Sequence, residues 1–230
     1  MTAPDPLSLS VLILALNEGA NLRILLPQLM EQLEKVSRDF EVIVVDGGSQ
    51  DDTVSVATSL GCRIVRQSQP GYGQAFREGL AACTQPFILT LDADMSHPVR
   101  YLEQMTTLIR DHDIIIASRY ISGGGCEMPR HRVVLSRVLN LLTRTLFALP
   151  LADMSSGYRL YRSEFVRQFP LKAQHFDVLI ELLVKAGRRD GRFAEVPFYY
   201  CNRESGVSKA RLFSFGIGYV RTLARLRAGL

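Results

Sequence analysis

Several features that would assign this chain to other classes of protein are scarce or absent. Its 230 residues include only four cysteines, Cys62, Cys83, Cys126 and Cys201, which lie far apart and form no C-x-x-C pair. This spacing indicates neither a disulfide framework nor a zinc site, so reduced, intracellular thiols are expected. No apolar run reaches the ~18 residues that a membrane-spanning helix needs, and the longest candidate, LFSFGIGYV, stops at Arg221.

Signals for export and for multiple domains are also missing. The first residues contain Asp5 and prolines in place of a basic segment, and the apolar stretch VLILAL is shorter than a signal peptide requires. No internal repeat, low-complexity tract or linker is visible. We therefore expect a chain that does not cross a membrane by itself, with one domain over residues 1–210 and a basic amphipathic helix over residues 211–230.

Charge is distributed unevenly along the chain. Residues 1–118 hold 8 Lys and Arg against 15 Asp and Glu, whereas residues 119–230 hold 19 against 8. The formal net charge of +4 hides this asymmetry. A basic second half predicts contact with something anionic, such as a phosphate, a lipid surface or a nucleic acid, unless it is simply a solvated face.

Apolar strand-like segments alternate with amphipathic helical segments in the first half. This alternation predicts an α/β fold with a Rossmann-like, mostly parallel sheet, helices on both faces and right-handed crossovers. After Tyr120 a glycine-rich loop, a long helix and further short elements follow, and we expect them to fold onto the same sheet. The predicted strands of the first half cover residues 8–15, 40–46, 62–67, 86–92 and 113–120.

Acidic residues stand at the ends of three predicted strands, at Glu18, Asp46 and the pair Asp92 and Asp94. In sheets of this type ligands bind at the carboxyl ends of strands. Residues i and i+2 of extended backbone point to the same side, so Asp92 and Asp94 can face one point. Two close carboxylates repel each other, and a divalent cation removes that repulsion. Mg²⁺ or Mn²⁺ takes one or two carboxylates and completes its shell with substrate phosphates and water.

An ordered set of motifs resembles family 2 glycosyltransferases, and in particular the branch of dolichyl-phosphate mannose synthases and polyprenyl-phosphate hexose transferases. The resemblance covers roughly residues 8–210. The motifs that carry it are LALNEGANL, VVDGGSQDDT, GYGQAFREGL, LDADMSHP, ASRYISGG, SSGYRLY and EVPFYYCNRESGVSK.

This resemblance implies a fold of the GT-A type, a nucleotide-sugar donor, a cation (Mg²⁺ or Mn²⁺) and a polyprenyl-phosphate acceptor. It favours GDP-mannose as the donor. It assigns Asp92 and Asp94 to the metal beside the donor diphosphate, and Lys209 to either phosphate group. The residues that it implies for binding of the donor are Ala15, Leu16, Glu18 and Asp46. Those that it implies for catalytic binding of the acceptor phosphate are Arg119, Arg132, Ser136 and Arg203.

The long helix predicted after residue 129 carries two separate polar stripes. Arg132 and Ser136 are four residues apart and share one face, which we expect to look into the site. Arginines seven residues apart form a second stripe, which we expect to reach toward lipid head groups from an apolar surface. The second stripe consists of Arg130, Arg137 and Arg144, and the apolar surface of Val134, Val138, Leu141 and Leu142.

The acceptor determines what catalytic groups are needed. A lipid monophosphate has a second pKa of about 6 and is already largely an oxyanion near neutral pH, so it needs no general base. A hydroxyl acceptor would need one, and Asp153 resembles the acidic position that serves as base in such relatives. We expect Asp153 to support or orient an arginine, His97 to cap a turn, and direct displacement to invert the anomeric carbon. No QxxRW motif of processive polysaccharide synthases is present.

Three other functions are considered. The enzyme could use a hydroxyl acceptor with Asp153 as base, or the chain could be a non-catalytic nucleotide-sugar-binding membrane subunit. Nucleic-acid binding is disfavoured, because the basic residues alternate with aliphatic ones and lack aromatic stacking platforms. We expect a cytoplasmic protein, peripheral at the cytoplasmic face of a membrane, that contacts the lipid surface or a membrane-anchored subunit through its C-terminal helix.

Overall fold

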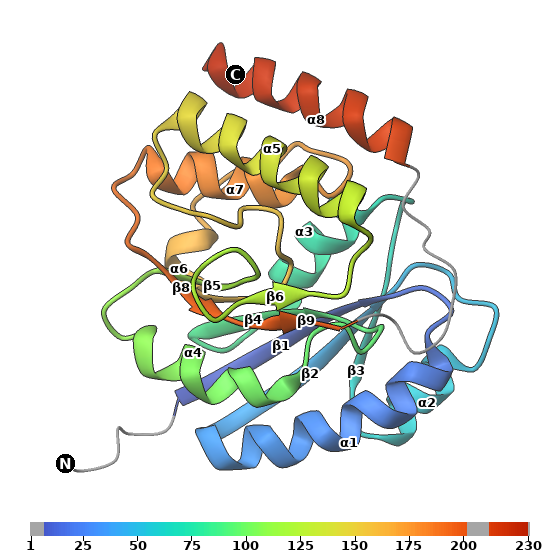
Figure 1. Ribbon diagram of the computed structural model, residues 1–230. Helices are drawn as coiled ribbons and strands as arrows, with labels where there is room; N and C mark the ends of the chain where they lie inside the picture. The colour runs from blue at the N-terminus through green and yellow to red at the C-terminus, as the bar shows by residue number, and fades with distance from the viewer. Residues whose placement is uncertain (1–6, 202–211, 230) are drawn as a thin grey trace.

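The computed structural model describes residues 7–201 and 212–229, and its centre is a twisted seven-stranded sheet (Figure 1). The strand order is β3-β2-β1-β4-β7-β5-β8. All neighbouring strands are parallel except the pairs that involve β7. The strands, in the order of the sheet, are β3 (Arg63–Arg66), β2 (Ser37–Asp46), β1 (Leu7–Ala15), β4 (Phe87–Asp92), β7 (Arg159–Arg162), β5 (Ile114–Ser118) and β8 (Phe193–Pro197).

Strand β7 is inserted between β4 and β5 and runs antiparallel to both. The sequence indicated a short strand here without its direction. Thr90 of β4 pairs with Arg159, the first residue of β7. Because β7 starts where β4 and β5 end, the turn that precedes it lies at the carboxyl edge of the sheet. This turn contains Asp153 and Ser155, so the second half of the chain reaches the same edge as the carboxylates of the first half.

Helices cover both faces of the sheet, as the sequence pattern predicts. Successive residues of β2 alternate between two buried clusters, with Val42 and Val44 in one and Ile43 and Val45 in the other. The first cluster also holds residues of α1, α2 and α4. The second holds residues of α3 (Tyr72–Ala82), α7 (Val178–Gly187) and α8 (Leu212–Arg227). Figure 1 shows these two groups of helices on opposite sides of the sheet. The helices on the first side are α1 (Gly19–Val36), α2 (Thr53–Ser59) and α4 (Leu102–Leu108), which follows the 3-10 turn η1 (Val99–Tyr101).

The second side is deeper, because α8 lies beyond α5 and α7 (Figure 1). The side chain of Tyr219 on α8 reaches α5, where its hydroxyl donates to the carbonyl of Leu139 at 3.2 Å. The sequence pattern missed β6, whose residues it assigned to a glycine-rich loop. In the structure β6 pairs with β9. The remaining elements are α3 (Tyr72–Ala82), α5 (Arg130–Phe147), α6 (Ser163–Val166), α7 (Val178–Gly187), α8 (Leu212–Arg227), β6 (Gly125–Cys126) and β9 (Tyr199–Tyr200).

Helix α5 exposes its apolar side chains. Of its residues only Asn140 and Thr143 are buried, whereas Val134 and Leu141 are each 61% exposed. The predicted apolar surface of this helix therefore faces solvent, together with the arginines at 130, 137 and 144. Among the described helices, none has the length and apolar character to cross a bilayer. The expected boundary between residues 210 and 211 falls outside the described residues.

Candidate active site

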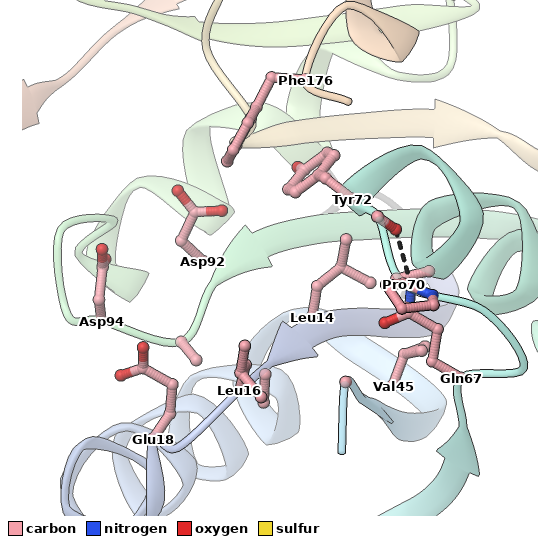
Figure 2. Close-up of a pocket in the computed structure, with 15 residues that line it drawn as sticks. Leu14, Leu16, Glu18, Val45, Gln67, Pro70, Tyr72, Asp92, Asp94 and Phe176 are labelled. Carbon is pink, nitrogen blue, oxygen red and sulfur yellow. Dashed lines mark hydrogen bonds between the residues drawn. The ribbon is translucent and has the colours of Figure 1, made fainter. Parts of the chain in front are cut away.

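A cavity of about 340 Å³ opens at the carboxyl ends of β1, β2 and β4. Asp92, Asp94 and Glu18 line it, and Figure 2 shows these three side chains along one edge, with Tyr72 and Phe176 beside Asp92. The adjacency of β2, β1 and β4 brings the strand ends together as the sequence predicts. We call this space the carboxylate cavity. Its other lining residues include Leu14, Ala15, Leu16, Val45, Gly47, Gln67 and Pro70.

Two neighbours hold the carboxylate pair in position. The ring of His97 is buried, its Nδ1 accepts the backbone N–H of Asp92 at 2.9 Å, and its Nε2 lies 3.7 Å from Asp92 Oδ2. Burial lowers the pKa of His97, although nearby carboxylates oppose this, so the ring is neutral near pH 7. A neutral ring that accepts at Nδ1 carries its proton on Nε2, on the side of Asp92. His97 was expected to cap a turn; in the structure it holds the backbone at Asp92 and places its Nε2 beside the Asp92 carboxylate.

The loop after Asp94 is bent sharply. Met95 has a φ of 65°, a left-handed conformation that is uncommon for a residue with a side chain. This bend returns Ser96 to Asp94, whose Oδ1 accepts hydrogen bonds from the backbone N–H and the hydroxyl of Ser96. Asp94 is only 4% exposed, while the side chain of Asp92 is 31% exposed. Backbone conformations of this kind persist where the surrounding structure enforces them, and they concentrate at functional sites.

The loops after β1 and β2 are bonded to each other at the same edge. Asn17, also left-handed with φ 53°, accepts the backbone N–H of Gln50, and the backbone N–H of Glu18 donates to Thr53 Oγ1 at 2.8 Å. Asp46 is buried, and its carboxylate accepts the backbone N–H groups of Gly48 and Ser49. Asp46 therefore shapes the loop at the end of β2, and it is not among the side chains that line the carboxylate cavity.

A second cavity, of about 230 Å³, contains the predicted acceptor residues Arg119, Arg132 and Ser136. We call it the arginine cavity. Arg119 follows β5, and the other two share one face of α5 as predicted. The Nε of Arg132 is buried and has no hydrogen-bond partner in the part of the chain that the structure describes. The rest of the lining is mainly apolar and consists of Met128, Leu135, Leu139, Ser155, Phe176, Ile180 and Tyr219.

Asp153 holds Arg119 from behind this cavity. Arg119 donates from Nε to Oδ2 and from Nη2 to Oδ1 of Asp153, each at 2.7 Å, and Asp153 is fully buried. Burial by itself raises the pKa of Asp153, but the Arg119 guanidinium and the hydrogen bonds outweigh it and hold that pKa below the usual value. Arg119 Nη2 also donates to Ser155 Oγ at 2.8 Å. The arginine is thus fixed in one orientation at the cavity wall.

Buried Arg159 anchors the turn that carries Asp153. Its guanidinium donates to the carbonyls of Met154 and Ser156 at 2.6 and 2.7 Å, and to that of Leu179 at 2.9 Å. Sequence reasoning did not single out Arg159, although it stands in the SSGYRLY motif. It also missed Phe176, which lines both cavities, and Tyr219, which α8 contributes to the arginine cavity. Neither aromatic residue has a local motif that could have identified it.

Two predicted site residues, Arg203 and Lys209, lie outside the described residues. Ala15, Leu16, Glu18, Asp92 and Asp94 gather at one cavity, and Arg119, Arg132 and Ser136 gather at the other. The two groups that were predicted to serve donor and acceptor thus occupy adjoining spaces that share Phe176.

Comparison with known proteins places the chain in a family. A sequence model described as Glycosyl transferase family 2 matches residues 10–169. The chain is 30% identical over 190 residues to a dolichyl-phosphate hexose transferase of Haloferax volcanii, a match that covers 81% of this chain and 80% of that protein. It is also 30% identical to a dolichol-phosphate mannosyltransferase of Pyrococcus furiosus (89% of this chain, 60% of that protein) and to a polyprenol monophosphomannose synthase of Mycolicibacterium smegmatis (86% and 79%).

The chain therefore belongs to glycosyltransferase family 2 and is a glycosyltransferase enzyme. Solved structures show the same fold. Glucosyl-3-phosphoglycerate synthase of Mycobacterium tuberculosis, crystallised with Mn²⁺, UDP and glucosyl-3-phosphoglycerate, superposes with a TM-score of 0.73 over 97% of this chain and 81% of that one, at 23% identity. The same enzyme with Mn²⁺ and UDP-glucose gives 0.74, with 97% and 80% covered, at 22% identity. The predicted GT-A type of fold is confirmed.

Proposed function

We propose that this enzyme transfers a hexose from a nucleotide sugar to the phosphate of a polyprenyl or dolichyl phosphate, with inversion at the anomeric carbon. The observation that carries the proposal is the pairing of two adjoining cavities with opposite charge, one edged by Asp92 and Asp94 and the other by Arg119 and Arg132. The named activities of the three relatives support it. Two of these names specify mannose, which is the proposed sugar. GDP-mannose as the donor is proposed from the sequence resemblance.

The carboxylate cavity fits a divalent cation of the Mg²⁺ or Mn²⁺ kind. Within residues 7–201 and 212–229, no cluster of three or more His, Cys, Asp or Glu is placed to hold a metal. Asp92 and Asp94 would hold the cation, with donor phosphates and water completing its shell, as Mg²⁺ commonly requires. A bound cation would neutralise charge on the departing diphosphate. His97 would hold the backbone at Asp92, and Ser96 would hold the carboxylate of Asp94, for that role.

The arginine cavity suits a phosphate on an apolar tail. Arginine donors match phosphate oxygens, and an unpaired guanidinium N–H such as that of Arg132 is costly to bury without an acceptor. Arg119, Arg132 and Ser136 would hold the acceptor phosphate in line with the anomeric carbon, which lowers the entropic cost of the reaction. Arg203 and Lys209 remain proposed phosphate ligands. The apolar lining of Leu135, Leu139 and Ile180 would contact the first isoprene units.

Asp153 is poorly suited to act as a general base. Both of its oxygens accept from Arg119, it is fully buried, and its lowered pKa weakens it as a proton acceptor. A phosphate acceptor needs no base, because it is ionised near neutral pH. This geometry favours the lipid-phosphate acceptor over a hydroxyl acceptor, and the presence of both Asp92 and Asp94 favours an enzyme over a non-catalytic subunit.

The exposed face of α5 is proposed to contact anionic lipids at the cytoplasmic face of a membrane. Val138 and Leu142 are 47% and 55% exposed on the same helix as the exposed arginines at 130, 137 and 144. An exposed apolar strip flanked by arginines is typical of helices that lie in the head-group region. A membrane-anchored subunit would be a further partner, and no nucleic acid is proposed.

The test compares Arg132→Ala with wild type, using a panel of nucleotide sugars, Mn²⁺ or Mg²⁺, and a short polyprenyl phosphate or a free hydroxyl acceptor. Arg132→Ala should abolish transfer to the lipid phosphate while the dissociation constant for the donor stays near that of wild type. Arg189→Ala, at an exposed arginine two residues after α7, serves as the control for lost charge. Equal loss of donor binding and transfer would contradict the acceptor role, and preferred transfer to the hydroxyl acceptor would contradict the proposed function.

A further inference from the structure

Phe176 occupies an unusual position between the two cavities. It is 37% exposed and lines both the carboxylate cavity and the arginine cavity. Its ring stacks on that of Tyr72, with centroids 3.9 Å apart and an interplanar angle of 23°. Figure 2 shows the two rings beside the carboxylate of Asp92. An apolar wall therefore stands where a sugar would pass from the donor phosphates toward the arginines.

The loop that carries Phe176, residues 172–177, is fixed by contacts from three helices. Glu181 of α7 accepts two of its backbone N–H groups, and Gly73 and Arg77 of α3 donate to two of its carbonyls. On the other side, Thr222 of α8 donates to Asp177. The bonds are Lys172 N and Ala173 N to Glu181 Oε2 (2.8 and 2.7 Å), Gly73 N to Gln174 O (2.9 Å), Arg77 Nη1 to Ala173 O (2.7 Å) and Thr222 Oγ1 to Asp177 Oδ2 (2.6 Å).

The Gly-Tyr-Gly stretch at residues 71–73 makes room for this loop. A Cβ at Gly73 would lie 2.1 Å from the carbonyl oxygen of Ala173, and one at Gly71 would lie 2.8 Å from that of Gln174. Gly71 also has a φ of 127°, which disfavours any residue with a side chain. The two glycines thus let α3 approach the loop closely. The consequence is that Tyr72, between them, lies in contact with Phe176.

Tyr72 contributes an apolar and uncharged surface to this wall. Burial, and then the charge of Asp92, raise the pKa of its phenol well above the usual value, so it stays neutral at physiological pH. The backbone contacts described above fix the loop that carries Phe176, and its partly exposed ring is held by stacking on Tyr72. A fixed, exposed ring is better explained by a ligand that packs against it.

We propose that the Tyr72–Phe176 stack is the wall of the sugar-transfer position, and that Phe176 is a positioning residue that keeps water from the anomeric carbon. This inference rests on the proposed function. In productive transfer, an acceptor phosphate oxygen bonds to the anomeric carbon while the diphosphate oxygen leaves with the bonding electron pair. In the competing reaction water supplies that oxygen, its proton passes to solvent, and free hexose is the product. Closing the site against water suppresses this second route.

The test measures both products from one reaction. The reaction contains GDP-mannose as the donor, Mn²⁺ and a short polyprenyl phosphate. The ratio of free hexose to glycosylated lipid phosphate is expected to rise about tenfold in Phe176→Ala, because the sugar loses its wall and water gains access. Phe176→Tyr, which restores a ring, should return the ratio toward the wild-type value. Leu60→Ala, at a side chain with the same 37% exposure at the end of α2, should leave the ratio unchanged.

A purely structural role for Phe176 would lower both products together and leave their ratio constant, and this result would overturn the inference. If Phe176→Ala is too weakly active to quantify, Phe176→Val, whose shorter side chain removes most of the volume of the ring, is measured instead, and an unchanged ratio there overturns the inference equally. Absence of glycosylated lipid phosphate with the wild-type enzyme would refute the proposed function itself. The two failures are therefore distinguishable.

Discussion

The carboxylate cavity and the arginine cavity are built in different ways. Asp92 ends β4, Asp94 follows it and Glu18 follows β1, and these are neighbouring parallel strands whose ends must meet at one edge. The arginine cavity instead collects residues from the end of β5, from α5, from the turn before β7, from α7 and from α8. The first site depends on local chain order, and the second depends on how distant segments pack. Substitutions in the two cavities should therefore affect different properties of the enzyme.

The largest effect is expected at the carboxylate cavity. Asp94→Ala should lower kcat/KM for every acceptor by about a hundredfold to a thousandfold, because charge on the leaving diphosphate loses its counterpart. Binding of the donor in the presence of Mn²⁺, measured by calorimetry, should weaken as well. Asp111→Ala, at an exposed acid before β5, is the matched control. Equal activity of the two variants would remove the carboxylate cavity from the chemistry.

Substitution beside the arginine cavity is expected to lower the free energy of unfolding. Asp153→Asn leaves the buried guanidinium of Arg119 without its counter-charge, and the free energy of unfolding should fall by about 3–5 kcal/mol. Denaturant unfolding measures this loss. The control is Glu31→Gln, which breaks an exposed pair with Lys35 and should leave the denaturation midpoint unchanged. Similar midpoints for both variants would mean that the Arg119–Asp153 pair contributes little.

The Arg119–Asp153 pair predicts that the free energy of unfolding depends on pH. Because the folded state lowers the pKa of Asp153, its contribution to stability is present above the usual aspartate pKa of about 4 and is lost as pH falls below it. The wild-type free energy of unfolding should therefore decrease below about pH 4 more steeply than that of Asp153→Asn. Parallel curves for the two proteins would show that Asp153 does not titrate with folding.

The smallest effect on stability is expected on the exposed face of α5. Leu141 is 61% exposed, so Leu141→Gln should change the free energy of unfolding by less than about 0.5 kcal/mol. Its binding to vesicles that contain phosphatidylglycerol should nevertheless weaken several-fold in a flotation assay. Ile24→Gln, on α1 across the sheet, should bind vesicles as wild type does. Equal binding by all three proteins would contradict the proposed lipid contact.

Much of the fold could be predicted because local residue patterns indicate its strands and helices. Apolar segments of strand length, separated by amphipathic helices, indicate a mostly parallel sheet with both faces covered, and the acidic residues at strand ends indicate where a ligand would bind. The i, i+4 spacing of Arg132 and Ser136 places both on one face of α5, and both line the arginine cavity. The direction and position of β7 carry no such local signal, because they depend on which strands it pairs with.

Other features follow only from long-range packing. Phe176 and Tyr72 are more than a hundred residues apart and stack because two glycines admit the 172–177 loop. Asp46 has the same strand-end position as Asp92 in the sequence, yet its carboxylate binds the backbone of its own loop.

The sequence by itself determined the alternation of strands and helices and the set of charged groups, since both depend on residue order along a few turns of chain. Only the tertiary structure decided which of those charges face a cavity, which neutralise each other, and which aromatic ring stands between the two cavities. These depend on contacts between segments that no local periodicity records.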